Sequence, residues 1–301
     1  MALMVENISD IHNNLYFVQG KNRARYPYSN SLLLGNYLID TGISSKLLRK
    51  LKRNYKIEHV ILSHWHEDHI SGNHILQDAQ FYCHVLDKPI IENINKMAWY
   101  YNIEQESVGE DLEKMFEILG MKDTPINHTI ENKEVIKIGD SLKLKVLHTP
   151  GHTAGHCSFI ELSSKIGFLG DIDLTNHPYY GNIDANLMDF ENSIKRLLDI
   201  DLDIVVTGHR DPIMDKKLIR EKLKNYHAII LAREEGILAE FSEHDKPIQP
   251  SDLRYKNLIY KKYSQFKDFE IIAEELMIEK HFDKLKSIDK IRVEKEGYVL
   301  A

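Results

Sequence analysis

Three histidines and two acidic residues stand within six consecutive positions of this 301-residue chain, directly after an apolar run at 59–62. After Ser63 the chain continues with His64, Trp65, His66, Glu67, Asp68 and His69. Side-chain packing does not require such a density of imidazole, whereas imidazole and carboxylate groups are common ligands of transition metals. We therefore interpret this stretch as half of a metal site whose remaining ligands should lie at the ends of later strands.

Three later apolar runs lead to a histidine or an aspartate in the same way. Residues 145–147 lead through Pro150-Gly151 to His152, residues 166–169 lead to Asp171, and residues 204–206 lead to His209. Buried strands deliver the residues that follow them to one edge of a sheet, where loops converge. Together the four stretches supply five histidines and two aspartates, enough for two metal ions with room for water. Such ligands suit zinc, iron or manganese, and the lack of a cysteine cluster argues against a structural zinc finger.

The order of these motifs resembles that of the metallo-β-lactamase fold superfamily. Positions 64–69 match its HxHxDH motif, and the other signatures follow in the family's order: Ile39-Asp40-Thr41-Gly42, Thr149-Pro150-Gly151-His152-Thr153, Leu169-Gly170-Asp171 and Thr207-Gly208-His209. The resemblance extends over residues 14–213. It implies an α/β fold, a four-layer αββα sandwich that holds two metal ions at one edge of its paired sheets, and activity as a hydrolase.

The resemblance also implies a role for each ligand. His64, His66 and His152 would hold the first metal ion, Asp68, His69 and His209 would hold the second, and Asp171 would bridge both. The expected cofactor is a pair of divalent ions, with zinc favoured and iron or manganese as alternatives. Asp68 has the additional catalytic role of orienting the attacking hydroxide.

Several polar residues beside these motifs match no ligand position. Asp40 is open between supporting a ligand and forming a turn, because Ser44 or Ser45 would cap the next helix equally well. Trp65 and Glu67 are interpreted as spacers, and His148 and His156 as local structure or as support for the ligands. Asp173 is interpreted as a turn residue, with a position at the pocket as the alternative. Of three residues near the predicted ligands, Tyr179, Tyr180 and Arg210, we select Tyr180 and Arg210 as candidate substrate-binding residues. Packing and salt bridging are the alternative roles.

Hydrophobic periodicity places strands and helices around these motifs. Gly35-Asn36 predicts a hairpin. Apolar residues at helical spacing over 88–122 predict an insertion of two helices, joined near 107–109, that walls a pocket or packs on the parent domain. The pattern becomes helical and charged after residue 215, so we expect a catalytic domain at 1–215 and a mainly helical domain at 216–301. The expected strands are 15–18, 31–34, 37–39, 59–62, 80–85, 142–147, 157–160, 166–169, 204–206, 290–293 and 297–300, and the expected helices are 45–53, 70–76, 194–198, 216–241, 252–264 and 268–284.

The family resemblance leaves the substrate open. The first hypothesis is a hydrolase that directs a metal-activated hydroxide at a small-molecule ester, thioester or lactone. The second is a nuclease, because the C-terminal helices and ribbon loosely resemble the winged-helix-like extension of the lactamase-β-like group, some members of which cut RNA. The third is an iron-dependent oxidoreductase, although the flavodoxin-like domain of the flavodiiron type is absent.

Composition narrows the partners and the compartment. The net charge of −7 argues against nucleic acid as the main partner. The part after position 215 has 18 basic and 16 acidic residues, and this small excess of positive charge is only weak evidence for nucleic-acid binding. No apolar run is long enough to span a bilayer, and the N-terminus does not resemble a signal peptide. Two cysteines, Cys83 and Cys157, cannot build a disulfide framework, which favours the cytoplasm. We expect a small-molecule substrate and no membrane partner, with a homodimer as one option for the long C-terminal helices.

Overall fold

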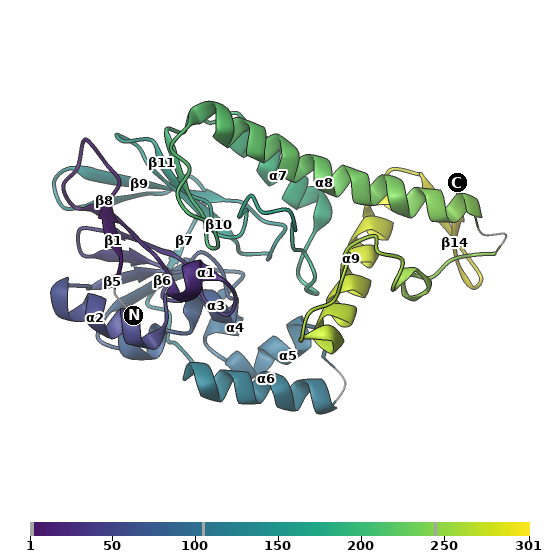
Figure 1. Cartoon of the computed structure of the whole chain (residues 1–301), viewed down its shortest axis with the longest axis horizontal. Helices are drawn as coiled ribbons and strands as arrows, with labels where there is room; N and C mark the ends of the chain where they lie inside the picture. Colours follow the sequence, from purple (N-terminus) through teal and green to yellow (C-terminus); the bar gives the residue numbers. More distant parts are fainter. Residues whose placement is uncertain (1–2, 104–105, 244–245) are drawn as a thin grey trace.

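The computed structural model describes residues 3–103, 106–243 and 246–301, and within them the chain forms two facing sheets covered by helices on both outer sides (Figure 1). This is the predicted four-layer αββα sandwich. A third, two-stranded sheet lies at the C-terminus. None of the helices in the described ranges is long and apolar enough to cross a membrane.

The first sheet has seven strands that follow one another in chain order. β1 to β4 pair antiparallel and β4 to β7 pair parallel, and Gly35, at φ +57°, turns the predicted hairpin between β3 and β4. β1 and β7 were not predicted. The strands are β1 (Val5–Asn7), β2 (Leu15–Val18), β3 (Ser31–Leu34), β4 (Tyr37–Ile39), β5 (His59–Ile61), β6 (Gln80–His84) and β7 (His128–Ile130).

The second sheet has five strands in the order β12-β11-β10-β9-β8. β11 and β12 are parallel, and the other neighbours are antiparallel. The strands are β8 (Val135–Ile138), β9 (Leu142–His148), β10 (Cys157–Glu161), β11 (Ile166–Phe168) and β12 (Ile204–Val206).

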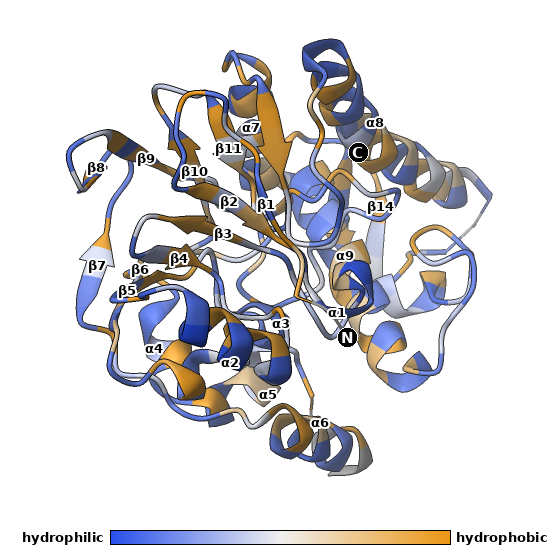
Figure 2. Ribbon diagram, turned by 60° about the vertical axis from the view of Figure 1, so that its left-hand side comes forward, coloured by the Kyte–Doolittle hydropathy of each residue, from blue (hydrophilic) through white to orange (hydrophobic). Residues whose placement is uncertain are grey.

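Three buried apolar clusters fill the spaces between the four layers. Strand β3 shows how the alternation of a strand builds them: Leu32 and Leu34 enter the core between the sheets, whereas Leu33 faces the helices. All three are fully buried because the sheet is covered on both faces. In Figure 2 central strands such as β3 and β4 are correspondingly orange, while the outer helices carry blue segments.

Helices α2 to α6 lie on the side of the first sheet, and α7 and α8 lie on the side of the second (Figure 1). Ser44 caps α2 by accepting a hydrogen bond from the Leu47 amide, so Asp40 is not its cap. The helical segments of the first 200 residues are α1 (Lys21–Ala24), α2 (Ser45–Asn54), α3 (Glu67–Ile70), η1 (Asn73–Ile75), α4 (Lys88–Ile91), η2 (Ile94–Lys96), α5 (Met97–Tyr100), α6 (Glu106–Leu119) and α7 (Leu187–Leu198).

The C-terminal part packs its helices against the second sheet. Leu223 of α8 and Met277 of α9 belong to the same buried cluster as Leu169 and Phe190 of the sandwich. The boundary near residue 215 stays a prediction, and this shared core crosses it. The C-terminal elements are α8 (Lys216–Glu243), η3 (Pro250–Leu253), α9 (Lys267–Ser287), β13 (Ile291–Glu294) and β14 (Gly297–Leu300).

Three predicted elements are wrong in kind or extent. Residues 252–264 contain only the end of η3 followed by irregular backbone. The predicted junction at 107–109 lies inside α6, because the packing of Leu112, Phe116 and Leu119 offsets the roughly 1 kcal/mol cost of a helical glycine at position 109. The helix predicted at 70–76 is replaced by α3, which begins within the histidine motif, and the 3-10 turn η1.

Candidate metal centre

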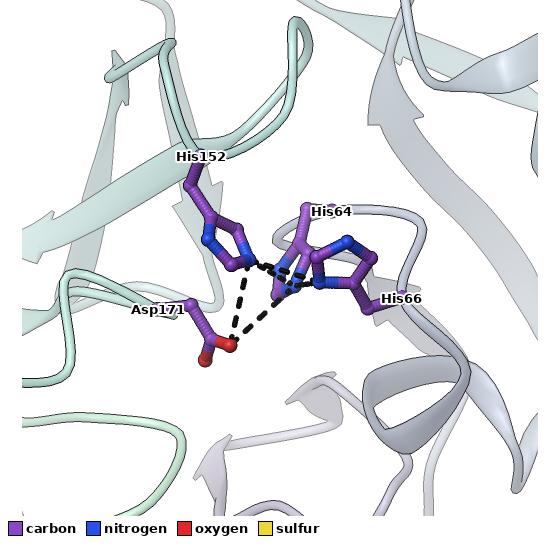
Figure 3. A group of neighbouring side chains, drawn as sticks. All are labelled: His64, His66, His152 and Asp171. Carbon is purple, nitrogen blue, oxygen red and sulfur yellow. Dashed lines mark hydrogen bonds and ion pairs between the residues drawn. The ribbon is translucent and has the colours of Figure 1, made fainter. Parts of the chain in front are cut away.

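All seven predicted ligands meet at one edge of the two sheets. His64 and His66 follow β5, Asp68 and His69 lie in α3, and the remaining ligands lie after β9, β11 and β12. They form two groups, and within each group the ligand atoms all lie within 4.8 Å of one another. The first group is His64, His66, His152 and Asp171, and the second is Asp68, His69 and His209. Figure 3 shows the side chains of the first group converging. The ligand roles of these residues stay predictions.

In the first group, three imidazole nitrogens point at one another. His152 Nε2 lies 2.9 Å from His66 Nδ1 and 3.2 Å from His64 Nε2, and the latter two nitrogens are 3.1 Å apart. Ligand nitrogens of a tetrahedral zinc site, each about 2.0–2.1 Å from the ion, are separated by about 3.3 Å. The nitrogen–nitrogen distances of the three histidines are therefore close to those of a tetrahedrally coordinated zinc ion.

The outward nitrogen of each histidine in the first group faces an acceptor. His152 Nδ1 lies 2.8 Å from the Tyr179 carbonyl, and His66 Nε2 lies 3.2 Å from Asn182 Oδ1. His64 Nδ1 lies 2.9 Å from Ser63 Oγ. These partners hold the proton on the outward nitrogen, so the inward nitrogens present lone pairs, as metal ligation requires.

The second group repeats this arrangement. His209 Nε2 lies 3.2 Å from Asp68 Oδ2, and its Nδ1 lies 2.8 Å from the Ala24 carbonyl. His69 Nε2 lies 2.9 Å from Asp171 Oδ1, whereas Asp171 Oδ2 faces His152 Nε2 at 3.5 Å. Asp171 thus directs one carboxylate oxygen toward each group, the arrangement expected of a bridging ligand.

Asp40 supports both groups from behind. Its carboxylate accepts hydrogen bonds from the Ser63 amide and hydroxyl, each at 2.7 Å, and from His69 Nδ1 at 2.6 Å. Since Ser63 Oγ also contacts His64, one buried carboxylate fixes a histidine in each group. Of the two roles left open for Asp40, these contacts favour support of the predicted ligands over a turn role alone.

The two groups differ in proton affinity. Burial lowers the pKa of His64, His66 and His152, and neighbouring histidines add to the effect. Burial also opposes protonation of His69 and His209, but the nearby carboxylates, that of Asp171 foremost, raise the pKa of both well above the usual range. A cation in the second group would therefore have to displace protons.

The donor set fits a pair of divalent ions. His69 Nε2 and Asp171 Oδ1 are buried and face each other at 2.9 Å without hydrogen-bond geometry, so both atoms are oriented in a way that suits a shared cation. Imidazole and carboxylate are also the ligand types of zinc, iron and manganese enzymes. The structure thus contains His/Asp clusters typical of dinuclear metallo-hydrolases.

The structure corrects one of the two substrate-binding predictions. Tyr180 is fully buried, and its hydroxyl lies 2.8 Å from His281 Nε2 and accepts from Arg233, so this side chain is not presented to a ligand. Arg210 is exposed next to His209 and stays a candidate. The ring of Tyr179 packs edge-on against His66 and His152, which places it beside the first group.

The polar neighbours of the motifs mostly support the backbone. His156 Nε2 accepts from the Asp171 amide at 3.1 Å, and His148 Nε2 donates to the Ala154 carbonyl at 2.8 Å. Asp173 accepts from the Thr175 amide at 3.1 Å, as its predicted turn role requires. Trp65 is more than a spacer, because its indole nitrogen donates to Asp184, which in turn fixes the Ala154 amide.

Glu67 has a partner set that the sequence did not indicate. Its buried carboxylate accepts hydrogen bonds from Tyr26, at 2.7 Å, and from Tyr101.

Tyr26 belongs to the loop around α1, where Asn22, Arg23 and Ala24 all have left-handed φ angles between 52° and 57°. This unusual turn presents the Ala24 carbonyl to His209. No composition or spacing signal marks it, because a backbone carbonyl has no sequence signature.

Comparisons with known proteins agree with this geometry. A family model described as "Metallo-beta-lactamase superfamily" matches residues 26–209. The Beta-lactamase-like protein 2 homolog of Caenorhabditis elegans is 26% identical over 255 residues, which cover 80% of this chain and 76% of that protein. Hydroxyacylglutathione hydrolase GloC of Haemophilus influenzae is 24% identical over 178 residues, which cover 56% of this chain and 76% of that protein.

Solved structures show the same fold. A metallo-beta-lactamase family protein from Thermus thermophilus superposes with a TM-score of 0.69 at 21% identity, over 100% of this chain and 98% of that one. A beta-lactamase domain protein from Burkholderia ambifaria gives a TM-score of 0.72 at 15% identity, over 99% and 93%. The family model matches more than half of the chain, and the seven residues of the superfamily's motifs meet at one point. The chain therefore belongs to the metallo-beta-lactamase superfamily and is an enzyme of that superfamily.

Proposed function

We propose that this enzyme hydrolyses a small-molecule ester, thioester or lactone with the help of two zinc ions. The observation that carries the proposal is the position of Asp171, whose two carboxylate oxygens face the two ligand groups. When bound, two such ions would supply a water nucleophile at neutral pH and would polarise the bond to be cleaved. His64, His66 and His152 would hold the first ion and Asp68, His69 and His209 the second, with Asp171 shared.

The protein's own residues position the reactants. Asp68 is buried and directs Oδ2 into the second group, where it would orient the nucleophile. Tyr101 stacks on the ring of His66 and Tyr179 packs edge-on against it, and we propose that the two tyrosines form an aromatic wall beside the first ligand group. Such a wall suits a compact acyl group, and one relative bears the name hydroxyacylglutathione hydrolase. We transfer from that name only the hydrolysis of an acyl compound.

A nuclease is the second candidate, and the segment 254–267, which is irregular up to the start of α9 at Lys267, favours it. The segment contains five basic residues, four aromatic residues and no acidic residue. Its Lys261, Lys262 and Lys267 are exposed, and Phe266 packs edge-on against Tyr26, whose hydroxyl bonds to Glu67 of α3. Cations combined with aromatic rings are the usual means of binding single-stranded nucleic acid.

A substrate screen separates the two candidates. We expect zinc-loaded protein to cleave p-nitrophenyl esters, acyl thioesters or lactones, and His66→Ala to be inactive on the same compounds. Cleavage of bis-p-nitrophenyl phosphate alone would reverse the order of the candidates. Iron in the purified protein together with oxygen uptake would instead favour an oxidoreductase.

A charge-reversal pair tests the nuclease directly. If RNA is the substrate, Lys261→Glu/Lys262→Glu should weaken RNA binding and reduce its salt dependence, because fewer counterions are released. Lys217→Glu/Lys224→Glu, on the exposed face of α8, is the matched control. Equal RNA affinity for both double variants would argue against a role of segment 254–267.

We also propose a cytoplasmic enzyme with no membrane partner. The two cysteines, Cys83 and Cys157, are free and buried, which supports a reducing compartment. A homodimer is a further proposal, and light scattering of the purified chain tests it.

A further inference from the structure

The loop at 177–183 supports two of the three histidines in the first ligand group. The Tyr179 carbonyl faces His152 Nδ1 at 2.8 Å, and Asn182 Oδ1 faces His66 Nε2 at 3.2 Å. Asn182 also donates from Nδ2 to the His152 carbonyl at 2.7 Å. The orientation of both rings therefore depends on where this loop lies.

The loop is held in place by the two C-terminal helices. From α8, Arg233 donates through Nη1 to the Pro178 carbonyl at 2.7 Å and to the Tyr180 hydroxyl at 3.1 Å, and its Nη2 contacts His177 Nδ1 at 3.1 Å. From α9, Lys280 Nζ donates to the Ile183 carbonyl at 2.8 Å. Both ends of the loop are thus tied to the C-terminal part.

Burial makes these contacts strong constraints. Arg233 is only 6% exposed, and a buried guanidinium is costly unless its N–H groups find partners. The three partners of the guanidinium named above all belong to the loop. The middle of the loop also packs tightly, because a Cβ on Gly181 would lie 3.0 Å from the Ala273 side chain of α9. The loop therefore has little freedom to shift relative to α8 and α9.

The histidines of the second ligand group have no such support from α8 or α9 among the described residues, although Tyr226 of α8 donates to the carbonyl of the shared ligand Asp171 at 3.1 Å. The outward nitrogens of His69 and His209 face Asp40 and the Ala24 carbonyl, both of which belong to the N-terminal part of the chain. Loss of the Arg233 or Lys280 contacts with the loop should consequently reach the first group and spare the histidines of the second.

We propose that α8 and α9 contribute to metal binding through Arg233 and Lys280, which are positioning residues for the first metal site. They act through the loop 177–183, which orients His152 and His66. This inference rests on the proposed two-metal centre and is independent of the substrate. The C-terminal part then serves metal binding, in addition to any role in substrate recognition.

Metal titration of full-length variants tests the proposal. We expect Arg233→Gln and Lys280→Met to bind one of the two ions 10- to 100-fold more weakly, the range typical of residues behind metal ligands, and the other ion as before. Arg233→Lys, which keeps the charge but loses the forked geometry, should lie between Arg233→Gln and the unmodified protein. Arg220→Gln is the matched control, since Arg220 of α8 donates to the Leu198 carbonyl, which lies outside the loop.

Cobalt substitution and melting of metal-free protein provide two further readouts. In Arg233→Gln, one cobalt equivalent should be lost from the visible absorption spectrum, whereas a purely structural role would lower the melting temperature of the metal-free protein without changing metal affinity. Two ions bound as tightly by Lys280→Met and by Arg233→Lys as by the unmodified protein would overturn the inference. Failure of the unmodified protein itself to bind two ions would instead refute the proposed function on which it rests.

Discussion

Each histidine of the two ligand groups turns one ring nitrogen outward to a hydrogen-bond partner and the other inward toward the other ligands. What lies behind the ring decides this: Ser63, Asn182 and the Tyr179 carbonyl in the first group, and Asp40 and the Ala24 carbonyl in the second. The sequence predicted the rings but, apart from the role left open for Asp40, not their partners. The partners matter because they fix the tautomer that a metal ion needs.

Removing a ligand should abolish both metal binding and activity. We expect His66→Ala and Asp171→Ala to lose hydrolysis, with Asp171→Ala losing more metal because Asp171 faces both groups. Elemental analysis of the purified variants measures this. His128→Ala is a suitable control, since His128 is exposed and stacks on Tyr82 away from the ligands. Full activity with normal metal content in either ligand variant would refute the assignment.

Asp40→Asn should weaken metal binding about 10- to 100-fold while the protein stays folded. Asp40 has φ +60°, and asparagine tolerates this left-handed conformation as well as aspartate does. The substitution removes the negative charge behind His69, so the imidazole loses the partner that fixes its tautomer. Isothermal titration of the metal-free variant measures the affinity, and circular dichroism checks the fold. An unchanged affinity would show that Asp40 is only a turn residue.

Strand ends and the glycines that follow them bring the ligand groups together. After β12, Gly208 lies so close to the centre that a Cβ there would be 2.5 Å from Asp171 Oδ1 and 2.7 Å from His69 Cε1. After β4, a Cβ on Gly42 would lie 1.5 Å from the Asp68 carbonyl oxygen. The absence of a side chain at Gly208 and Gly42 is thus explained by the close approach of ligand residues.

Gly208→Ala should reduce metal content and activity, because the added methyl group must displace Asp171 or His69. Gly109→Ala is a matched control of opposite sign. Position 109 lies within α6, its nearest contact would be 3.9 Å away, and alanine there should stabilise the protein by about 0.5–1 kcal/mol. Metal analysis and thermal melting of both variants test the pair. Normal metal content in Gly208→Ala would show that the site tolerates the displacement.

The sandwich and the C-terminal helices share one buried cluster, so groups buried where they meet should affect the stability of the whole molecule. His177 is such a group. Burial, followed by the charge of Arg233, lowers its pKa to about 3. In the unfolded chain the pKa returns to about 6.5, so the unfolded state binds more protons whenever the pH falls below that value.

Stability should therefore be complete above pH 6.5 and decrease as the pH falls toward 3. Between pH 7 and pH 5, the unmodified metal-free protein should lose about 2 kcal/mol more than His177→Asn, which keeps an acceptor for Arg233 but does not titrate. Urea denaturation of both proteins at both pH values measures the difference. Equal losses would mean that His177 is protonated in the folded protein.

Local patterns in the sequence predicted the ligands because each follows an apolar strand in a short motif, from His64 after β5 to His209 after β12. Short apolar runs likewise predicted strands such as β3, whereas the layering of the sheets and helices was implied by the family resemblance. The sequence failed where long-range packing decides the outcome. Residues 252–264 form no regular helix, and α6 continues through Gly109, because contacts with distant elements outweigh local propensity.

The sequence by itself thus determined which side chains make up the candidate site and which strands deliver them. Only the tertiary structure decided what stands behind them. The carbonyls of Ala24 and Tyr179 reach His209 and His152 across 185 and 27 residues of chain, and a backbone carbonyl looks the same at every position of a sequence. The contact between Arg233 and the loop could not be predicted from the sequence for the same reason. Arg233 binds the Pro178 carbonyl, and the course of that loop depends on how α8 and α9 pack.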